Sequence, residues 1–83
     1  MTRDELFEEL ASIEHERWSR WQKYMHSLCY ELEAGDLVIP ASRVKHWERQ
    51  ITTPYADLSE KEKNYDRDEV KRYWHLVEPN EQI

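Results

Sequence analysis

Three stretches of the chain repeat apolar residues at intervals of three and four, the spacing of amphipathic helices. The first has the broadest apolar stripe, formed by Leu6, Leu10, Ile13, Trp18, Trp21, Met25, Leu28 and Leu32. We expect this helix to begin after an N-cap at Thr2 and to end at Glu33 or Ala34, with Gly35 as the residue that follows the helix end. The opposite face, which includes Arg20, should lie in solvent.

A second helix is predicted from Val44, Trp47 and Ile51, with Pro40 in its first turn and its end near Thr52. The helix must stop there, because the residue before a proline is pushed out of the helical region, and residues 54–58 are expected to be an extended connector. No alternation long enough to indicate a β-strand is present.

Ser59 and Glu62 form a capping-box pattern that opens a third helix, which should run to about Val77 and stop before Pro79. The sequence therefore predicts an all-α fold, a small three-helix domain with a long first helix. Residues 1–78 are expected to form this single domain, and residues 79–83 a polar, mobile tail.

Charged residues interrupt two of the apolar stripes. Glu14 and Arg17 lie within the stripe of the first helix, and Asp66 lies one turn before Val70 on the stripe of the third. Charges at such positions are costly unless they are paired or line a wet cleft. Two interpretations stay open: Arg17 bridges Glu14 and Asp66 to fix the register of the helices, or these groups line a pocket for an anionic ligand.

The chain also has more aromatic residues than three short helices need for a core, namely Trp18, Trp21, Tyr24, Trp47, Tyr55, Tyr73 and Trp74. Most aromatic residues at helical spacing pack in a core. However, aromatic rings beside Arg and Lys also suit a nucleotide, since rings stack on the base and the cations bind phosphate. Tyr55 is the strongest candidate because it lies on a connector after a proline.

The chain has 83 residues and a net charge of −6, and this charge limits the classes of molecule that it is expected to bind. The charge disfavours binding to a nucleic acid polymer or to an anionic membrane, and no apolar run approaches the length of a membrane span. A single cysteine, Cys29, suits a reducing cytoplasm, where we expect the protein to act.

No pattern indicates catalysis, a metal site or a cofactor. His15 and Glu16 begin like the zinc motif H-E-x-x-H, but Ser19 occupies the second histidine position. His26 and Cys29 share a helix face, yet nothing orients that histidine as a base. We therefore expect a protein that is not an enzyme and that has no cofactor.

Two segments together resemble the ryanodine-receptor-type (RyR) repeat domain in its bacterial and phage versions. Glu14-His15-Glu16-Arg17-Trp18 resembles the family's E-H-x-R-W signature. Residues 54–58, Pro-Tyr-Ala-Asp-Leu, followed by Lys63, Asp66-Arg67 and Val70, resemble its second signature, P-[WY]-x-x-L and K-x-x-D-R-x-x-V. The chain departs from the family after the first helix, where residues 35–38 replace a glycine-flanked aromatic segment. As a whole it looks like small proteins of tailed phages.

The resemblance implies a compact helical domain that binds a nucleotide-derived ligand. The implied ligand-binding residues are His15, Arg17, Trp18, Tyr55, Lys63, Asp66 and Arg67, to which we add Trp21 from the surplus aromatics. The leading hypothesis is a phage-type module that sequesters a phosphorylated immune signal, such as an ADP-ribose-like or cyclic nucleotide, as an anti-defence sponge.

Two other hypotheses stay open. The acidic residues Glu5, Glu8, Glu9 and Glu16 would suit a protein that binds and inhibits a basic host protein, and the charged network would also suit a structural accessory protein. In each case a small core gains from shared burial, so we expect a homodimer or higher oligomer through the first helix, with Trp21, Met25, Leu28 and Leu32 as its seam.

Overall fold

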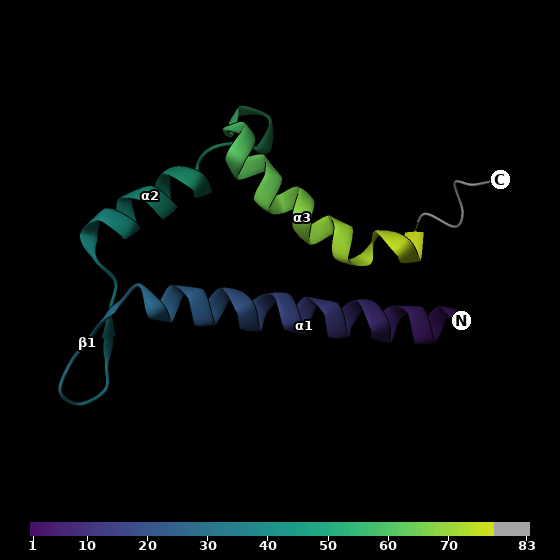
Figure 1. Cartoon of the computed structure of the whole chain (residues 1–83), viewed down its shortest axis with the longest axis horizontal. Coiled ribbons are helices and arrows are strands. Elements are labelled where there is room, and N and C mark those ends of the chain that lie inside the picture. Colours follow the sequence, from purple (N-terminus) through teal and green to yellow (C-terminus); the bar gives the residue numbers. More distant parts are fainter. Residues whose placement is uncertain (78–83) are drawn as a thin grey trace.

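Helix α1 (Arg3–Ser27) forms one side of an open frame, and α2 (Ala41–Ile51) and α3 (Glu60–Val77) form the other (Figure 1). This computed structural model describes residues 1–77, so the expected tail lies outside the described residues. Strands β1 (Tyr30–Glu31) and β2 (Leu37–Val38) form a hairpin between α1 and α2, and a 3₁₀ turn, η1 (Tyr55–Asp57), precedes α3. The expected all-α class, with three helices and a long first one, is confirmed for these residues.

The first helix ends earlier than predicted. It stops at Ser27, where the Ser27 hydroxyl donates a 2.6 Å hydrogen bond to the Tyr24 carbonyl, and the Cys29 thiol donates to the Met25 carbonyl at 3.2 Å. Side chains that bond to the last carbonyls offer the backbone an alternative to the helix. The expected helix end at residues 33–34 is therefore wrong, and Leu32 lies in the hairpin loop rather than on the helical stripe.

The hairpin explains the position of the single glycine. Gly35 has φ +95° and donates its N–H to the Leu32 carbonyl at 2.9 Å, while the Leu32 N–H donates to the Asp36 carbonyl at 2.8 Å. This left-handed residue after a turn is the usual geometry of a three-residue hairpin loop, and Gly adopts it without a Cβ clash. Gly35 thus turns a hairpin, with Tyr30 paired to Val38, and does not follow a helix end.

The starts of two helices agree with the sequence. The Thr2 hydroxyl accepts from the Glu5 N–H and the Glu5 carboxylate accepts from the Thr2 N–H, both at 3.1 Å. Ser59 and Glu62 exchange the same pair of bonds at 3.2 Å each, which confirms the predicted capping box. The connector before it is a 3₁₀ turn, closed by the Leu58 N–H on the Tyr55 carbonyl, and not an extended segment.

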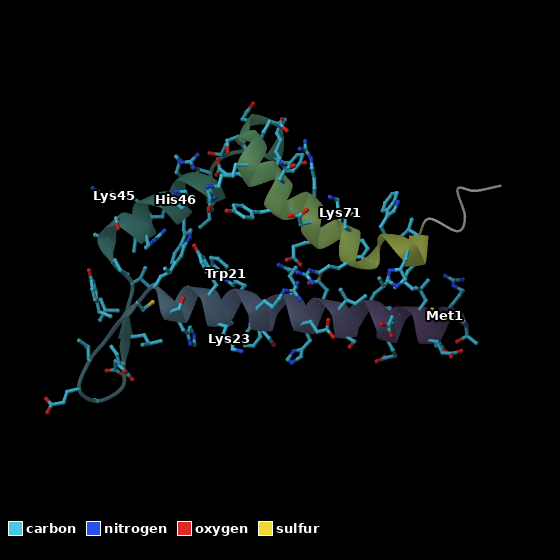
Figure 2. The ribbon with its side chains drawn as sticks, in the orientation of Figure 1. Met1, Trp21, Lys23, Lys45, His46 and Lys71 are labelled. Atoms are coloured by element: carbon cyan, nitrogen blue, oxygen red, sulfur yellow. The ribbon has the colours of Figure 1, made fainter. Side chains whose placement is uncertain are left out.

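The frame holds very little core. Among residues 1–77 no side chain is fully buried; the most sheltered apolar residues, only partly covered, include Leu6, Leu10, Ile13, Val44 and Leu76. The radius of gyration is 17.0 Å, whereas a compact chain of this length would have about 12 Å. Figure 2 shows side chains reaching from α1 toward α2 and α3 across the frame. No helix in the described part of the chain has the length and apolar character that a membrane span requires.

Candidate functional site

Arg17 lies on α1, half exposed, and its ion pair is with Glu14 of the same helix. Its guanidinium donates to one oxygen of Glu14, from Nη2 at 2.7 Å and from Nε at 3.1 Å. This hydrogen bond and the attraction of Glu14 raise the pKa of Arg17, and the more distant carboxylates of Glu69 and Asp66 act in the same direction. The Arg17 bond lowers the pKa of Glu14. Among residues 1–77, Arg17 pairs with Glu14 and makes no ion pair with Asp66. The bridge between helices that we considered is therefore absent from the described residues.

Among residues 1–77, Arg20 forms the ion pair that joins α1 to α3. Its Nη2 lies 2.6 Å from Oε2 of Glu69, with the side chains 39% and 34% exposed. The same Glu69 oxygen lies 3.4 Å from Nε of Arg72, one turn further along α3. The sequence pattern placed Arg20 in solvent, which is wrong because the face of α1 that meets α3 includes this position.

Tyr55, Lys63 and Arg67 gather where η1 meets the first turns of α3, and we call them the cation–aromatic cluster. The Lys63 Nζ lies 5.8 Å from the centroid of the Tyr55 ring, within the range of a cation–π contact. Arg67 Nη1 donates to Glu60 at 2.8 Å and to Asn64 at 2.9 Å. The cluster thus offers an aromatic face and two cations on adjacent turns.

Glu60 is the counter-ion of this cluster. Its carboxylate pairs with Arg67 at 2.8 Å and with Lys63 at 3.7 Å, yet its side chain is 74% exposed. The hydrogen bond from Arg67 and the attraction of Arg67 and Lys63 lower the pKa of Glu60. The Glu60 bond raises the pKa of Arg67, and Tyr55 adds to that effect. At neutral pH the Glu60 carboxylate and the Arg67 guanidinium are therefore both charged.

His15 and Trp18 lie apart from the cluster. Their rings stack on each other with centroids 6.1 Å apart and planes inclined by 19°, and the Trp18 side chain is 56% exposed. Among the described residues no hydrogen bond or ion pair connects either of them to α3. The structure thus brings Tyr55 of η1 close to Lys63 and Arg67 of α3, which also carries Asp66, whereas His15 and Trp18 lie on α1.

Trp21 belongs to a different feature, which the sequence analysis missed. The centroid of its ring lies 5.3 Å from that of Trp47 of α2 in an edge-to-face arrangement. The Trp21 side chain points into the frame (Figure 2). Around this pair is an open hollow of about 440 Å³, which we call the tryptophan groove; it is lined by Trp21, Met25, Ile39, Trp47, Gln50 and Ile51. The spacing of Trp47 and Ile51 indicated an apolar face on α2, but not which part of α1 it would meet.

Glu62 ties α2 to α3. One oxygen of its carboxylate accepts from Gln50 Nε2 at 2.9 Å and from Arg49 Nη2 at 3.0 Å, and the other accepts the Ser59 N–H. The hydrogen bonds from Gln50 and Ser59 are the largest causes that lower the pKa of Glu62 to about 2. Glu62 is thus a structural carboxylate, which the sequence showed only in its capping role.

Comparisons with models of protein families, with curated proteins and with solved structures find no match for this chain. The geometry of the described residues is therefore the evidence for the candidate site. Of the residues expected to bind a ligand, the cation–aromatic cluster and Asp66 lie on η1 and α3, and Arg17 lies on α1 within the influence of the carboxylates of α3.

Proposed function

We propose that this chain is a non-enzymatic binding module for a small phosphorylated ligand of the nucleotide class, captured at the cation–aromatic cluster. The observation that supports the proposal is the Lys63 ammonium 5.8 Å from the Tyr55 ring, with Arg67 on the next turn. An aromatic face can stack on a base, and a neighbouring guanidinium can bind phosphate oxygens in a bidentate fashion. The second RyR-like signature of the sequence, residues 54–70, includes the same three residues.

The cluster can exchange its carboxylate for a phosphate at low cost. Glu60 is mostly exposed, and exposed ion pairs contribute only about 0–1 kcal/mol each. A phosphate has a larger charge and more acceptor oxygens than a carboxylate, so it competes well for Arg67 and Lys63. Glu60 can then swing into water without leaving a buried charge unpaired.

Arg17 supplies a third cation on the facing helix. The carboxylates of Glu69 and Asp66 raise its pKa across the frame, so Arg17 is close enough to act on charges of α3, the helix that carries Lys63 and Arg67. Capture of an anion needs a locally positive site rather than a positive protein, and the net charge of −6 acts mainly through distant, screened groups. Sequestration of a signal requires only this binding energy, which suits the anti-defence role that the resemblance implies.

The proposal is tested by native mass spectrometry and calorimetry with ADP-ribose and a panel of cyclic dinucleotides as probes. At least one probe should bind and return unchanged after denaturation. Arg67→Gln and Tyr55→Ala should each weaken that probe by about tenfold or more, which corresponds to about 1.4 kcal/mol. Glu60→Gln should strengthen it, because the competing carboxylate is gone.

Lys61→Gln is the matched control, since Lys61 is an exposed cation of the same helical turn and pairs with no carboxylate in the described chain. This variant should bind as the unchanged protein does. Binding that survives Arg67→Gln and Tyr55→Ala with full helical content would refute the site. A probe that returns chemically altered would refute a purely binding function.

A further inference from the structure

The chain exposes far more surface than a folded protein of its mass should. Its accessible surface is 7204 Å². The usual scaling of surface with mass gives about 5,400 Å² for a compact chain of this size, so the excess is about 1,800 Å². Large apolar side chains make up part of this excess, with Ile51 80% exposed and Trp21, Ile39 and Leu37 each about 40% exposed.

The tryptophan groove is where this apolar surface is hollowed. It lies between the end of α1, the strand that leads into α2, and α2 itself, and no charged residue lines it. The hairpin beside it adds further exposed apolar side chains, namely Tyr30, Leu32, Leu37 and Val38. An exposed apolar surface of this extent on a small protein marks a surface that another molecule covers.

We propose that a second copy of this chain covers the tryptophan groove, giving a two-fold symmetric homodimer in which each chain completes the core of the other. If each chain loses its excess surface, the pair buries about 3,600 Å², which lies within the range of obligate dimers. A small ligand or a short peptide would cover too little area to return the chain to ordinary compactness. The occupant must be comparable in size to the chain itself.

The net charge of the chain bears on which face the second copy would cover. Two chains of net charge −6 repel each other, and an apolar face free of charged groups brings them together without placing like charges in contact. The tryptophan groove is such a face, with the Gln50 amide as the polar group in its lining. A two-fold axis places the same patch on both chains, so no complementary surface elsewhere is needed. The expected dimer seam along α1 is thus relocated to the angle between α1 and α2.

The test is the mass and the thermal stability of the full chain over a range of concentrations. Light scattering should give twice the monomer mass of 10.3 kDa at micromolar concentration. The unfolding temperature should rise by about 5–10 °C over a hundredfold increase in protein concentration, because association favours the folded state.

Ile51→Lys is the decisive variant. Ile51 is almost fully exposed in a single chain, and lysine is favourable in the last turn of a helix, so a monomer would tolerate this change. In the dimer it places an unpaired charge in the groove and should weaken association at least about a hundredfold. His46→Lys adds the same charge at an exposed position of α2 outside the groove lining and should leave association unchanged (Figure 2).

A chain that has the monomer mass at micromolar concentration, with an unfolding temperature independent of concentration, would overturn the proposal. Equal masses and stabilities for Ile51→Lys and His46→Lys dimers would overturn the location. The dimer does not depend on the proposed ligand, because Tyr55, Lys63 and Arg67 lie outside the groove lining. Failure of either proposal can therefore be told from failure of the other.

Discussion

The Arg20–Glu69 ion pair should account for a measurable part of the attachment of α3 to α1. We would replace Arg20 by Met and Glu69 by Gln, singly and together, so that each variant keeps most of its side-chain volume. The double-mutant cycle removes the separate effect of the Arg72 contact with Glu69, because that contact is lost in both Glu69 variants. What remains is the free energy of the pair itself.

Its size follows from distance and exposure. The two charged atoms lie 2.6 Å apart, a charge-assisted hydrogen bond, and both side chains are only about a third exposed. Fully exposed pairs give about 0.2–1 kcal/mol. The partial shelter places this pair near the upper end of that range, so we expect a coupling free energy of about 1 kcal/mol.

The assay is urea unfolding followed by circular dichroism, at one fixed protein concentration, in about 0.1 M and 1 M salt. Lys71 and Asp68 provide a matched control pair on α3 alone, 3.5 Å apart and 76% and 64% exposed. The same cycle there, with Lys71→Met and Asp68→Asn, should give about 0.3 kcal/mol or less. High salt should abolish the control coupling and leave part of the Arg20–Glu69 coupling, since sheltered charges are screened less.

Equal couplings for the two pairs would refute the reasoning, because only the first joins two helices. A coupling for Arg20 and Glu69 that vanishes in 1 M salt would show that water surrounds the pair. In that case the attachment of α3 to α1 would depend on apolar contacts alone.

Two further predictions concern the hairpin and the link between α2 and α3. Gly35→Ala should lower the free energy of unfolding by about 1–2 kcal/mol, because the position needs a positive φ that alanine adopts only with strain. No neighbouring atom would contact the new Cβ, so this backbone strain is the whole expected effect. Gly35→Asn should cost less, and a Gly35→Ala variant as stable as the unchanged protein in urea unfolding would contradict this account. The carboxylate of Glu62 has a pKa of about 2 when folded and an ordinary value of 4.5, so its contribution is present above about pH 4.5 and is lost as the pH falls toward 2. Glu62→Gln should flatten that part of the stability profile, and an unchanged acid slope in urea unfolding would show that other carboxylates are responsible.

The sequence predicts features that depend on neighbours within one turn. Thr2 with Glu5, and Ser59 with Glu62, are capping pairs in which both partners lie four positions or fewer apart, and both form as expected. The end of α1 was missed because the hairpin depends on pairing between Tyr30 and Val38, and strands of two residues show no alternation.

The candidate site likewise contains contacts between residues close in sequence, which could be predicted, and contacts between separate helices, which could not. Tyr55 and Lys63 are joined by a short turn, so their proximity was within reach of local reasoning. The contacts of Arg20 with Glu69 and of Trp21 with Trp47 depend on how separate helices are oriented, which no local spacing specifies. The predicted apolar stripe also included Trp18, which is 56% exposed, and left out Arg20, which pairs with Glu69 of α3.

The open frame also bears on the order of folding. Most hydrogen bonds of the described chain lie within one helix, one turn or the hairpin, and few residues distant in sequence come near each other. Contacts of this kind form in microseconds, since little loop entropy is lost before they are made. We therefore expect the helices to appear early as separate units, and their docking to be the slow step. In the proposed homodimer this docking is completed by the second chain, so the folding rate would rise with protein concentration.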